Sequence, residues 1–491
     1  MTHDGGHSEL SDQMVIRRQK VDEWREQRIE PFGGRFVQSH YSTDIITNFT
    51  ELEGTEVSVA GRIRARRGHG KACFIDLQDT MGSIQLYAKV DLLGQEAYTH
   101  LGRLDIGDII GVNGTVFRTN RGEISIEMKT FELLAKALRP LPEKWHGLKD
   151  VELRYRQRYL DLITNSAARK VFESRSKIIK AMREFLENKG FLEVETPMLH
   201  PVLGGANARP FVTYHNALDM SFYLRIAPEL YLKKLLVGGI DRVFEIGKNF
   251  RNEGVSTKHN PEFTAMEAYW AYADFEDMMR LTEELTAYMA VQATGSTVVE
   301  YQGMKLDFTP PWPRMSMNDS VKEHTGLDIL SMTDSEAVTQ ARNLGVSVKD
   351  DATVGEVLNA VFEDKVEEHL VQPTYITHHP VDVSPLAKRN AENPLVTDRF
   401  EAYANTWEIL NGFSELNDPI DQRGRFERQM EARARGDEEA QELDEDFLEA
   451  LEYGMPPAAG LGIGIDRLVM LLTNSASIRD VLLFPHMRPR D

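Results

Sequence analysis

Cysteine is almost absent from this chain, since Cys73 is the only one in 491 residues. An intramolecular disulfide is therefore impossible, and a zinc site built on cysteines is excluded. Disulfides are rare in reducing compartments, so this composition fits a protein of the cytoplasm, and we expect a cytoplasmic location.

Long apolar runs are absent as well. No stretch of about 18 apolar residues occurs, so no transmembrane helix is expected, and residues 1–13 lack the apolar core of a signal peptide. Positive charge is scarce, with 57 Lys and Arg against 77 Asp and Glu and a net charge of −20. This balance taken alone argues against a nucleic-acid partner, but phosphate contacts depend on local charge, and a basic patch can override it.

Such a basic patch is present near the N-terminus. Residues 57–71 contain no acid, and their basic residues are Arg62, Arg64, Arg66, Arg67 and Lys71. From residue 57, apolar and polar residues alternate in three short strands, a helix and two further strands over about 80 residues, which is typical of an OB-fold barrel. A polar amphipathic helix is predicted before it, at residues 10–28.

Strand alternation predicts that Phe74 and Gln85 lie on the outward face of this barrel, together with Arg62, Arg64 and Arg66. An exposed aromatic ring beside arginines and an amide can stack on an unpaired base and read it. The alternative for a single outward Phe is a packing contact with a neighbouring domain.

A polar hairpin is predicted in the middle of the chain, with strands at residues 243–253 and 261–271. The side chains that we expect on one of its faces are Glu245, Arg251, Glu253, Phe263, Glu267 and Tyr269. Burying these groups dry is costly, so they favour a charged ligand that carries an aromatic ring. The alternative is a surface hairpin with salt bridges.

A second arginine motif lies near the C-terminus. Gly460, Gly462 and Gly464 alternate on a predicted strand, where glycine leaves room for a ligand, and Arg467 opens the next helix. The spacing is not GxGxxG, and too little chain follows for a dinucleotide-binding βαβ unit of about 30 residues. Two permanently charged arginines, Arg251 and Arg467, suit a polyphosphate and a carboxylate.

Residues 407–418 form a third constellation in which Asn411, Phe413 and Glu415 share strand parity. Asn411-Gly412 between apolar runs is also a strong hairpin-turn signal, and the residues by themselves favour the turn.

Together these motifs resemble motifs 2 and 3 of class II aminoacyl-tRNA synthetases, and residues 190–197 resemble motif 1. From about residue 57 to the C-terminus the chain resembles the lysyl enzymes of bacteria. The resemblance implies an α+β fold, in which an N-terminal OB-fold β-barrel precedes a class II catalytic domain built on an antiparallel sheet flanked by helices. The implied segments are a helical lead-in at 1–50, the barrel at 51–138, a linker at 139–165, and the catalytic domain at 166–491 with a helical insertion at 318–370.

The resemblance also implies roles for individual residues. ATP would be bound by Arg251, Glu253, His259, Phe263, Glu408 and Arg467, of which Arg251 and Arg467 are catalytic. Lysine would be bound by Gly205, Glu229, Arg251, Glu267, Tyr269, Asn411, Phe413, Glu415 and Gly462. The anticodon would be bound by Arg66, Phe74 and Gln85. Glu408 and Glu415 would hold Mg²⁺, and the turn would lie at about residues 404–406, which leaves Asn411 inside a strand.

The implied function is activation of L-lysine by ATP and transfer of the lysyl group to the 3′-terminal adenosine of tRNA(Lys), by a homodimer. One alternative is an aspartyl- or asparaginyl-type enzyme, which needs cations facing its side-chain pocket. Two others are a lysyl-transferring protein modifier, whose family lacks the barrel, and a regulatory module without chemistry.

Overall fold

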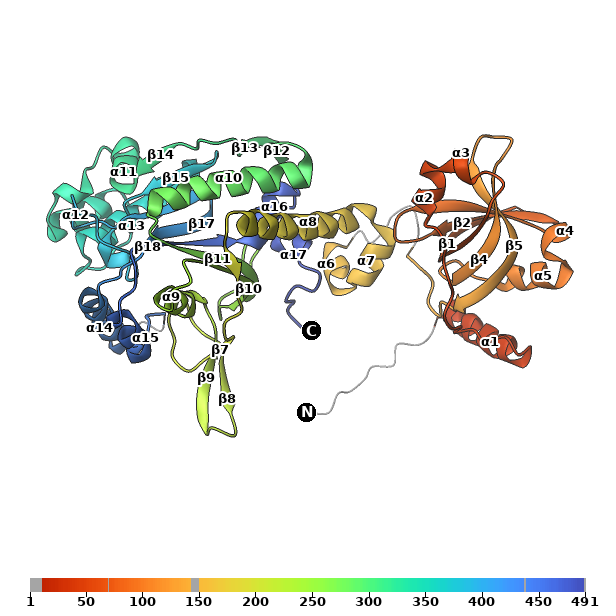
Figure 1. Cartoon of the computed structure of the whole chain (residues 1–491), viewed down its shortest axis with the longest axis horizontal. Coiled ribbons are helices and arrows are strands. Elements are labelled where there is room, and N and C mark those ends of the chain that lie inside the picture. Colours follow the sequence, from red (N-terminus) through yellow and green to blue (C-terminus); the bar gives the residue numbers. More distant parts are fainter. Residues whose placement is uncertain (1–10, 69, 143–149, 437–438, 490–491) are drawn as a thin grey trace. The chain divides into compact units, whose positions relative to one another are not determined.

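The computed structural model describes residues 11–68, 70–142, 150–436 and 439–489 (Figure 1). The chain divides into two compact units, residues 1–147 and residues 148–491. Within the described ranges, no helix is both long enough and apolar enough to cross a membrane.

The first unit is a closed barrel with the strand order β1-β2-β3-β5-β4, which confirms the predicted OB fold. Its strands are β1 (Glu56–Arg67), β2 (Ala72–Gln78), β3 (Ser83–Lys89), β4 (Ile109–Arg118) and β5 (Ile124–Ala135). Its helices are α1 (Asp12–Glu26), α2 (Ser42–Thr47), α3 (Phe49–Leu52), α4 (Val90–Leu93) and α5 (Gln95–Arg103).

The barrel core follows the alternation of the sequence. Ile75 and Leu77 of β2 are buried. Phe74, whose side chain points to the opposite face of the same strand, is only half-buried. The predicted N-terminal helix is α1, and it packs on the barrel through Trp24, which is 2% exposed. The guanidinium of Arg17 adds hydrogen bonds to the carbonyl oxygens of Ala137 and Ile106.

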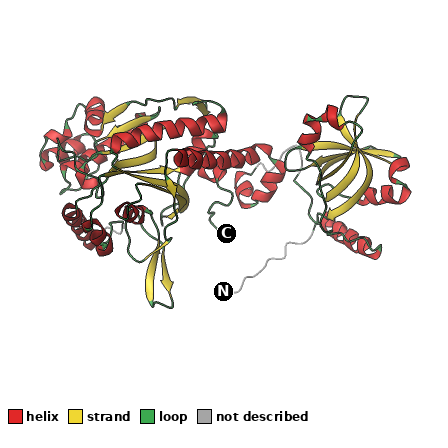
Figure 2. Ribbon diagram, in the orientation of Figure 1, coloured by secondary structure: helices red, strands yellow, loops and turns green. Residues whose placement is uncertain are grey.

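The second unit combines long helices with strands, as Figure 2 shows. Its helices are α6 (Val151–Arg156), α7 (Arg158–Thr164), α8 (Ser166–Asn188), α9 (Glu229–Val237), α10 (Phe275–Thr294), α11 (Met317–Thr325), α12 (Asp334–Asn343), α13 (Val354–Lys365), α14 (Pro419–Ala434), α15 (Glu445–Glu452), α16 (Ile465–Leu472) and α17 (Ile478–Val481). Its strands are β6 (Leu192–Glu193), β7 (Leu199–His200), β8 (Val212–His215), β9 (Met220–Leu224), β10 (Arg242–Phe250), β11 (Glu262–Ala271), β12 (Val298–Tyr301), β13 (Met304–Asp307), β14 (Arg314–Ser316), β15 (Thr374–Thr377), β16 (Arg399–Ala404), β17 (Trp407–Ser414) and β18 (Ala458–Gly464).

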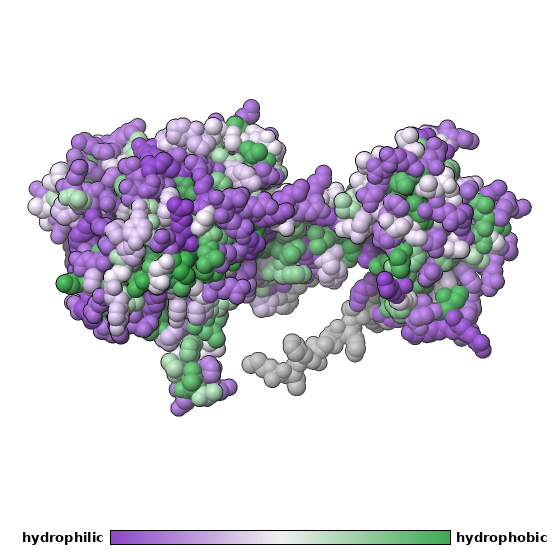
Figure 3. Space-filling model, in the orientation of Figure 1, coloured by the Kyte–Doolittle hydropathy of each residue, from purple (hydrophilic) through white to green (hydrophobic). Residues whose placement is uncertain are grey.

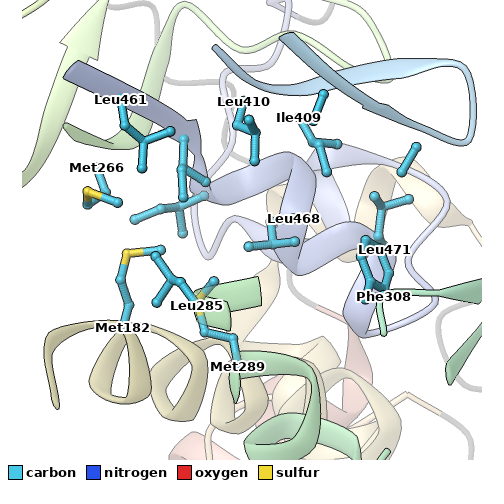
Figure 4. Packing of buried hydrophobic residues seen from close by; sticks show 14 of the residues in the cluster. Met182, Met266, Leu285, Met289, Phe308, Ile409, Leu410, Leu461, Leu468 and Leu471 are labelled. Carbon is cyan, nitrogen blue, oxygen red and sulfur yellow. The ribbon is translucent and has the colours of Figure 1, made fainter. Parts of the chain in front are cut away.

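A mixed sheet in the order β14-β15-β16-β17-β18-β11-β10-β6 organises this unit. Only its two terminal pairs are parallel, so the predicted antiparallel character is confirmed. One face of the sheet packs on α8, α10 and α16, where Met266, Leu410 and Leu461 meet Met182 and Leu468 (Figure 4). Because side chains alternate across a strand, the neighbours of these residues face the other side, where the cavity lies.

The sequence set apart two segments of the chain, residues 318–370 and residues 139–165, and both contain helices. Residues 318–370 are helical as predicted, and α11, α12 and α13 enclose a hydrophobic cluster of their own. Of the expected linker at 139–165, residues 143–149 lie outside the described part of the chain, and residues 151–164 are largely helical. α6 and α7 pack within the second unit, where Arg158 donates hydrogen bonds to the carbonyl oxygens of Arg479 and Leu482.

Candidate active site

A cavity of about 410 Å³ opens on the face of the sheet opposite α8 and α10. Residues from β11, β16, β17 and β18 form its floor, and the loop after β10 forms part of its rim. The predicted ATP and lysine residues in its lining are Gly205, Glu229, Arg251, Glu253, His259, Phe263, Glu267, Tyr269, Glu408, Asn411, Phe413, Gly462 and Arg467. Glu415 is not in the lining, because its side chain is fully buried beneath it.

The predicted hairpin is β10 paired with β11, but its first strand ends earlier than expected. Strand β10 stops at Phe250, so Arg251 and Glu253 lie in the loop and not on the strand face. The backbone N–H of Arg251 donates to the carbonyl oxygen of Pro261 at 2.9 Å, and its guanidinium lies 5.1 Å from the centre of the Phe263 ring. Its Nε is buried with no hydrogen-bond partner in the described chain, which leaves a donor for a ligand.

The turn before β17 decides between the two readings of Asn411-Gly412. Asn405 and Thr406 carry positive φ angles of 53° and 62° between β16 and β17, so the turn lies where the resemblance implies. Asn411 is inside the strand, opposite Gly462 of β18, and the hairpin turn favoured by the residues alone is wrong.

A β-bulge determines which acids meet in the cavity. Glu408 pairs with Tyr403 and Leu410 pairs with Ala402, so Ile409 is an extra residue on β17. The bulge reverses the alternation and brings Glu408 to the cavity face with Asn411. Glu408 lies seven positions before Glu415, an odd spacing that would place the two on opposite faces of a regular strand.

Glu401 on β16 is an acid of this cavity that the sequence reasoning missed. Arg399 donates hydrogen bonds to Glu401 Oε1 at 2.5 Å and to Asn411 Oδ1 at 3.0 Å, so it orients both side chains. The signal in the sequence was the alternation of Arg399, Glu401 and Tyr403 on a strand before a turn.

One end of the cavity combines these acids with cations. Arg467 donates to the carbonyl oxygen of Glu408 at 2.7 Å and to Nε2 of His259 at 3.0 Å. Burial, followed by the charge of Glu401, raises the pKa of Glu408 to about 7. Burial and then the nearby Arg467 lower the pKa of His259, which therefore is an uncharged acceptor at neutral pH.

The other end of the cavity is a cluster of buried carboxylates. Burial, followed by the charge of Glu229, raises the pKa of Glu267 to about 8, and Tyr269 donates to Glu267 Oε2 at 3.0 Å. Burial also raises the pKa of Glu229 and of Glu415. Gly460 makes room for this cluster, because a Cβ there would lie 2.1 Å from Glu415 Oε1.

The expected magnesium pair of Glu408 and Glu415 does not fit this geometry. The Glu415 carboxylate is buried at the end of the cavity that contains Glu229 and Glu267, and it pairs with Lys233. At the other end, burial and then the charge of Glu401 raise the pKa of Glu408. Glu401, like Glu408, lines the cavity, and its oxygens accept hydrogen bonds from Arg399 and Tyr403. The described residues contain no cluster of three or more potential metal ligands. Two carboxylates suit Mg²⁺, which is commonly held by one or two acids with substrate phosphates completing its shell.

The barrel carries a separate surface of interest. Phe74 lies 5.0 Å from Tyr87 and Tyr87 lies 5.9 Å from Phe117, measured between ring centres, so the three rings form a row. Gln85 of β3 pairs with Asp76 on the same face as Phe74.

A bulge at Arg64 corrects the prediction for Arg66. The register of β1 against β2 shifts between Ile63 and Ala65, so Arg67 pairs with Phe74. Arg66 instead turns to the carbonyl oxygens of Leu101 and Gly102.

Comparisons with known proteins agree with this architecture. Residues 150–488 match the family model of class II tRNA synthetases (D, K and N), and residues 57–134 match that of the OB-fold nucleic acid binding domain. A lysine--tRNA ligase from Pelotomaculum thermopropionicum is 59% identical over 99% of this chain and 97% of its own length. One from Bacillus subtilis is 55% identical over 99% of both chains.

An OB-fold barrel, followed by a largely antiparallel sheet with an arginine-rich and acid-rich cavity, defines a class II aminoacyl-tRNA synthetase. The chain belongs to this class and, within it, to the family of the lysine--tRNA ligases.

Proposed function

We propose that this protein activates L-lysine with ATP and transfers the lysyl group to tRNA(Lys). The observation that carries the proposal is the division of one cavity into two ends, with Arg251 between them. Glu229 and Glu267 line one end with Glu415 buried beneath them, and Arg467 and His259 lie with two more acids at the other end.

The amino-acid end suits a substrate with two ammonium groups and one carboxylate. Glu229 takes the α-ammonium, and Arg251 takes the carboxylate. Glu267 and Tyr269 take the ε-ammonium, and the charge of Glu415 beneath them adds to its attraction. Gly205, Asn411, Phe413 and Gly462 complete the walls. Buried acids left without an ammonium are penalised, which rejects uncharged amino acids of the same size.

The other end suits ATP. Phe263 stacks on the adenine, and Glu253 accepts a hydrogen bond from its amino group. Arg251 contacts the α-phosphate, while His259 and Arg467 contact the outer phosphates. When bound, Mg²⁺ held by Glu401 and Glu408 neutralises phosphate charge.

Catalysis requires orientation and charge stabilisation, and no side-chain nucleophile. The lysine carboxylate oxygen attacks the α-phosphorus, the new P–O bond forms, and the bond to the β-phosphate oxygen breaks to release pyrophosphate. Arg251 and Arg467 stabilise the charge that develops. The 3′-hydroxyl of the terminal adenosine of tRNA then attacks the carbonyl carbon, and AMP leaves.

The aspartyl- or asparaginyl-type alternative needs a cation free to face the substrate side chain. Lys233 lies buried beneath this end of the cavity, and its two neighbours, Glu229 and Glu415, already neutralise it. This arrangement favours a cationic substrate.

The barrel surface of Phe74, Gln85 and Arg67 supports tRNA binding at the anticodon, and a cytoplasmic location fits the single cysteine. We also propose a homodimer, which is supported by exposed apolar side chains on β6, β7 and the β8–β9 hairpin.

The decisive experiment is ATP–pyrophosphate exchange by the purified protein without tRNA, assayed with each standard amino acid. We expect exchange with lysine alone, and we expect Arg251→Ala to abolish it. Exchange with aspartate or asparagine would refute the assignment of the pocket. Exchange with no amino acid would favour the regulatory or modifying alternatives.

A further inference from the structure

Lys233 lies on the inward face of α9, fully buried beneath the amino-acid end of the cavity, where it pairs with the lining residue Glu229. Its Nζ is 2.6 Å from Glu229 Oε1 and also pairs with Glu415 Oε2. The ring of Phe413 lies 5.5 Å from the same ammonium. Lys233 therefore joins the carboxylates proposed to bind the two ammonium groups of lysine.

Stability alone does not account for a lysine in this position. Its ammonium lies 6.0 Å from the ring of Phe447, which belongs to a hydrophobic cluster with Leu232, Leu236 and Phe426. Taking an ammonium out of water is costly, and hydrophobic residues of similar volume often pack such a site equally well. A role in the cavity explains the charge better.

The charges facing this end of the cavity give that role. Its acids are Glu229 on α9, Glu267 on β11 and Glu415 after β17, and Tyr269 donates a hydrogen bond to Glu267 and is near enough for all three charges to raise its pKa. Arg225 and Arg399 already pair with Glu245 and Glu401, and Arg251 faces the middle of the cavity. An ammonium ligand favours the ionised form of each acid, and when all three are ionised Lys233 neutralises one negative charge and leaves two for a substrate with two ammonium groups.

We propose that Lys233 is a positioning residue that sets the selectivity of the pocket for a dicationic amino acid, by holding Glu229 and Glu415 in place and by fixing the net charge between them. This proposal rests on the proposed function. Without Lys233, three neighbouring carboxylates have no internal cation, so they repel one another or take up protons. Both ends of the substrate then lose their partners.

The test is a comparison of Lys233→Met with Lys234→Met in lysine-dependent ATP–pyrophosphate exchange. Lys234 is the next residue of the same helix, but it points to the surface, where it pairs with the exposed Asp446. We expect Lys233→Met to raise the KM for lysine at least about tenfold, the size of a lost charge-assisted contact. The KM for ATP should change less than about twofold, and Lys233→Arg should recover part of the loss. Lys234→Met should leave both values unchanged.

An unchanged KM for lysine in Lys233→Met overturns the proposal, and so does an equal loss for lysine and ATP, which indicates general disruption. If Lys233→Met does not fold, as judged by circular dichroism and thermal unfolding, Lys233→Gln provides the same test with a smaller change in polarity. Failure of the wild-type protein to exchange with lysine would instead refute the proposed function.

Discussion

At the scale of single residues, the amino-acid end of the cavity contains carboxylates whose pKa values burial has raised. Glu267 has a pKa of about 8, so it is largely protonated at neutral pH in the free protein. An ammonium ligand favours the ionised form. We therefore expect the KM for lysine to fall as the pH rises from about 6.5 to about 8.5, across the pKa of Glu267.

Glu267→Gln tests this, since it keeps the shape of the side chain and removes its titration. The variant should show a higher KM for lysine at pH 8.5 and a flatter profile in exchange assays. The effect of rising pH on folding stability has the opposite sign to its effect on lysine binding. A carboxylate with a raised folded-state pKa destabilises the fold as the pH rises from about 4.5 to about 8, so the variant should lose less stability over that window. A profile identical to that of the wild type would exclude Glu267 from the pocket.

At the scale of elements, the sequence predicted the strands but not their irregularities. Alternation located β2, β3, β11 and β18, because a buried face imposes period two on each of them. One extra residue reverses that period, and no local signal marks Arg64 or Ile409 as the residue that a bulge accommodates. This is why Arg66 was expected on the wrong face and why Glu401 was missed as the neighbour of Glu408.

Lys233 shows a different limit. An i,i+4 pair with Glu229 on a helix is visible in the sequence, yet most such pairs are exposed and contribute little. Only the fold shows that this pair is buried beside Glu415, which lies far away in the chain.

The β8–β9 hairpin is the element with the clearest surface signal. It extends from the body of the second unit in Figure 1, and apolar residues gather near its end in Figure 3. Val212 is 62% exposed and Leu218 58% exposed. Monomeric proteins rarely present such a patch without a partner, so we expect it to be buried in the homodimer.

Substitution of both Val212 and Leu218 by Glu should shift the protein from dimer to monomer in sedimentation velocity. Tyr453→Glu is a matched control, because Tyr453 is 81% exposed on another part of the surface. It should leave the mass unchanged. A dimer that survives the double substitution would show that this hairpin does not contribute to the interface.

At the scale of the whole molecule, the proposed function divides the reaction between the two units. The cavity belongs entirely to the second unit, and the aromatic row with Phe74 belongs to the first. In the proposed function, adenylate formation needs only the cavity, whereas selection of the tRNA also needs the barrel.

This division predicts that Phe74→Ala will leave lysine-dependent pyrophosphate exchange intact and lower kcat/KM for aminoacylation of tRNA(Lys). The loss should be about tenfold or more, because the stacking of one base contributes about 1–3 kcal/mol. Arg67→Ala should act in the same direction, since Arg67 shares the face of Phe74. Arg66→Ala is the internal control for the bulge and should change aminoacylation less than Arg67→Ala does. Equal losses of exchange and aminoacylation in Phe74→Ala would contradict the anticodon role, and a larger effect at Arg66 than at Arg67 would contradict the assignment of faces on β1.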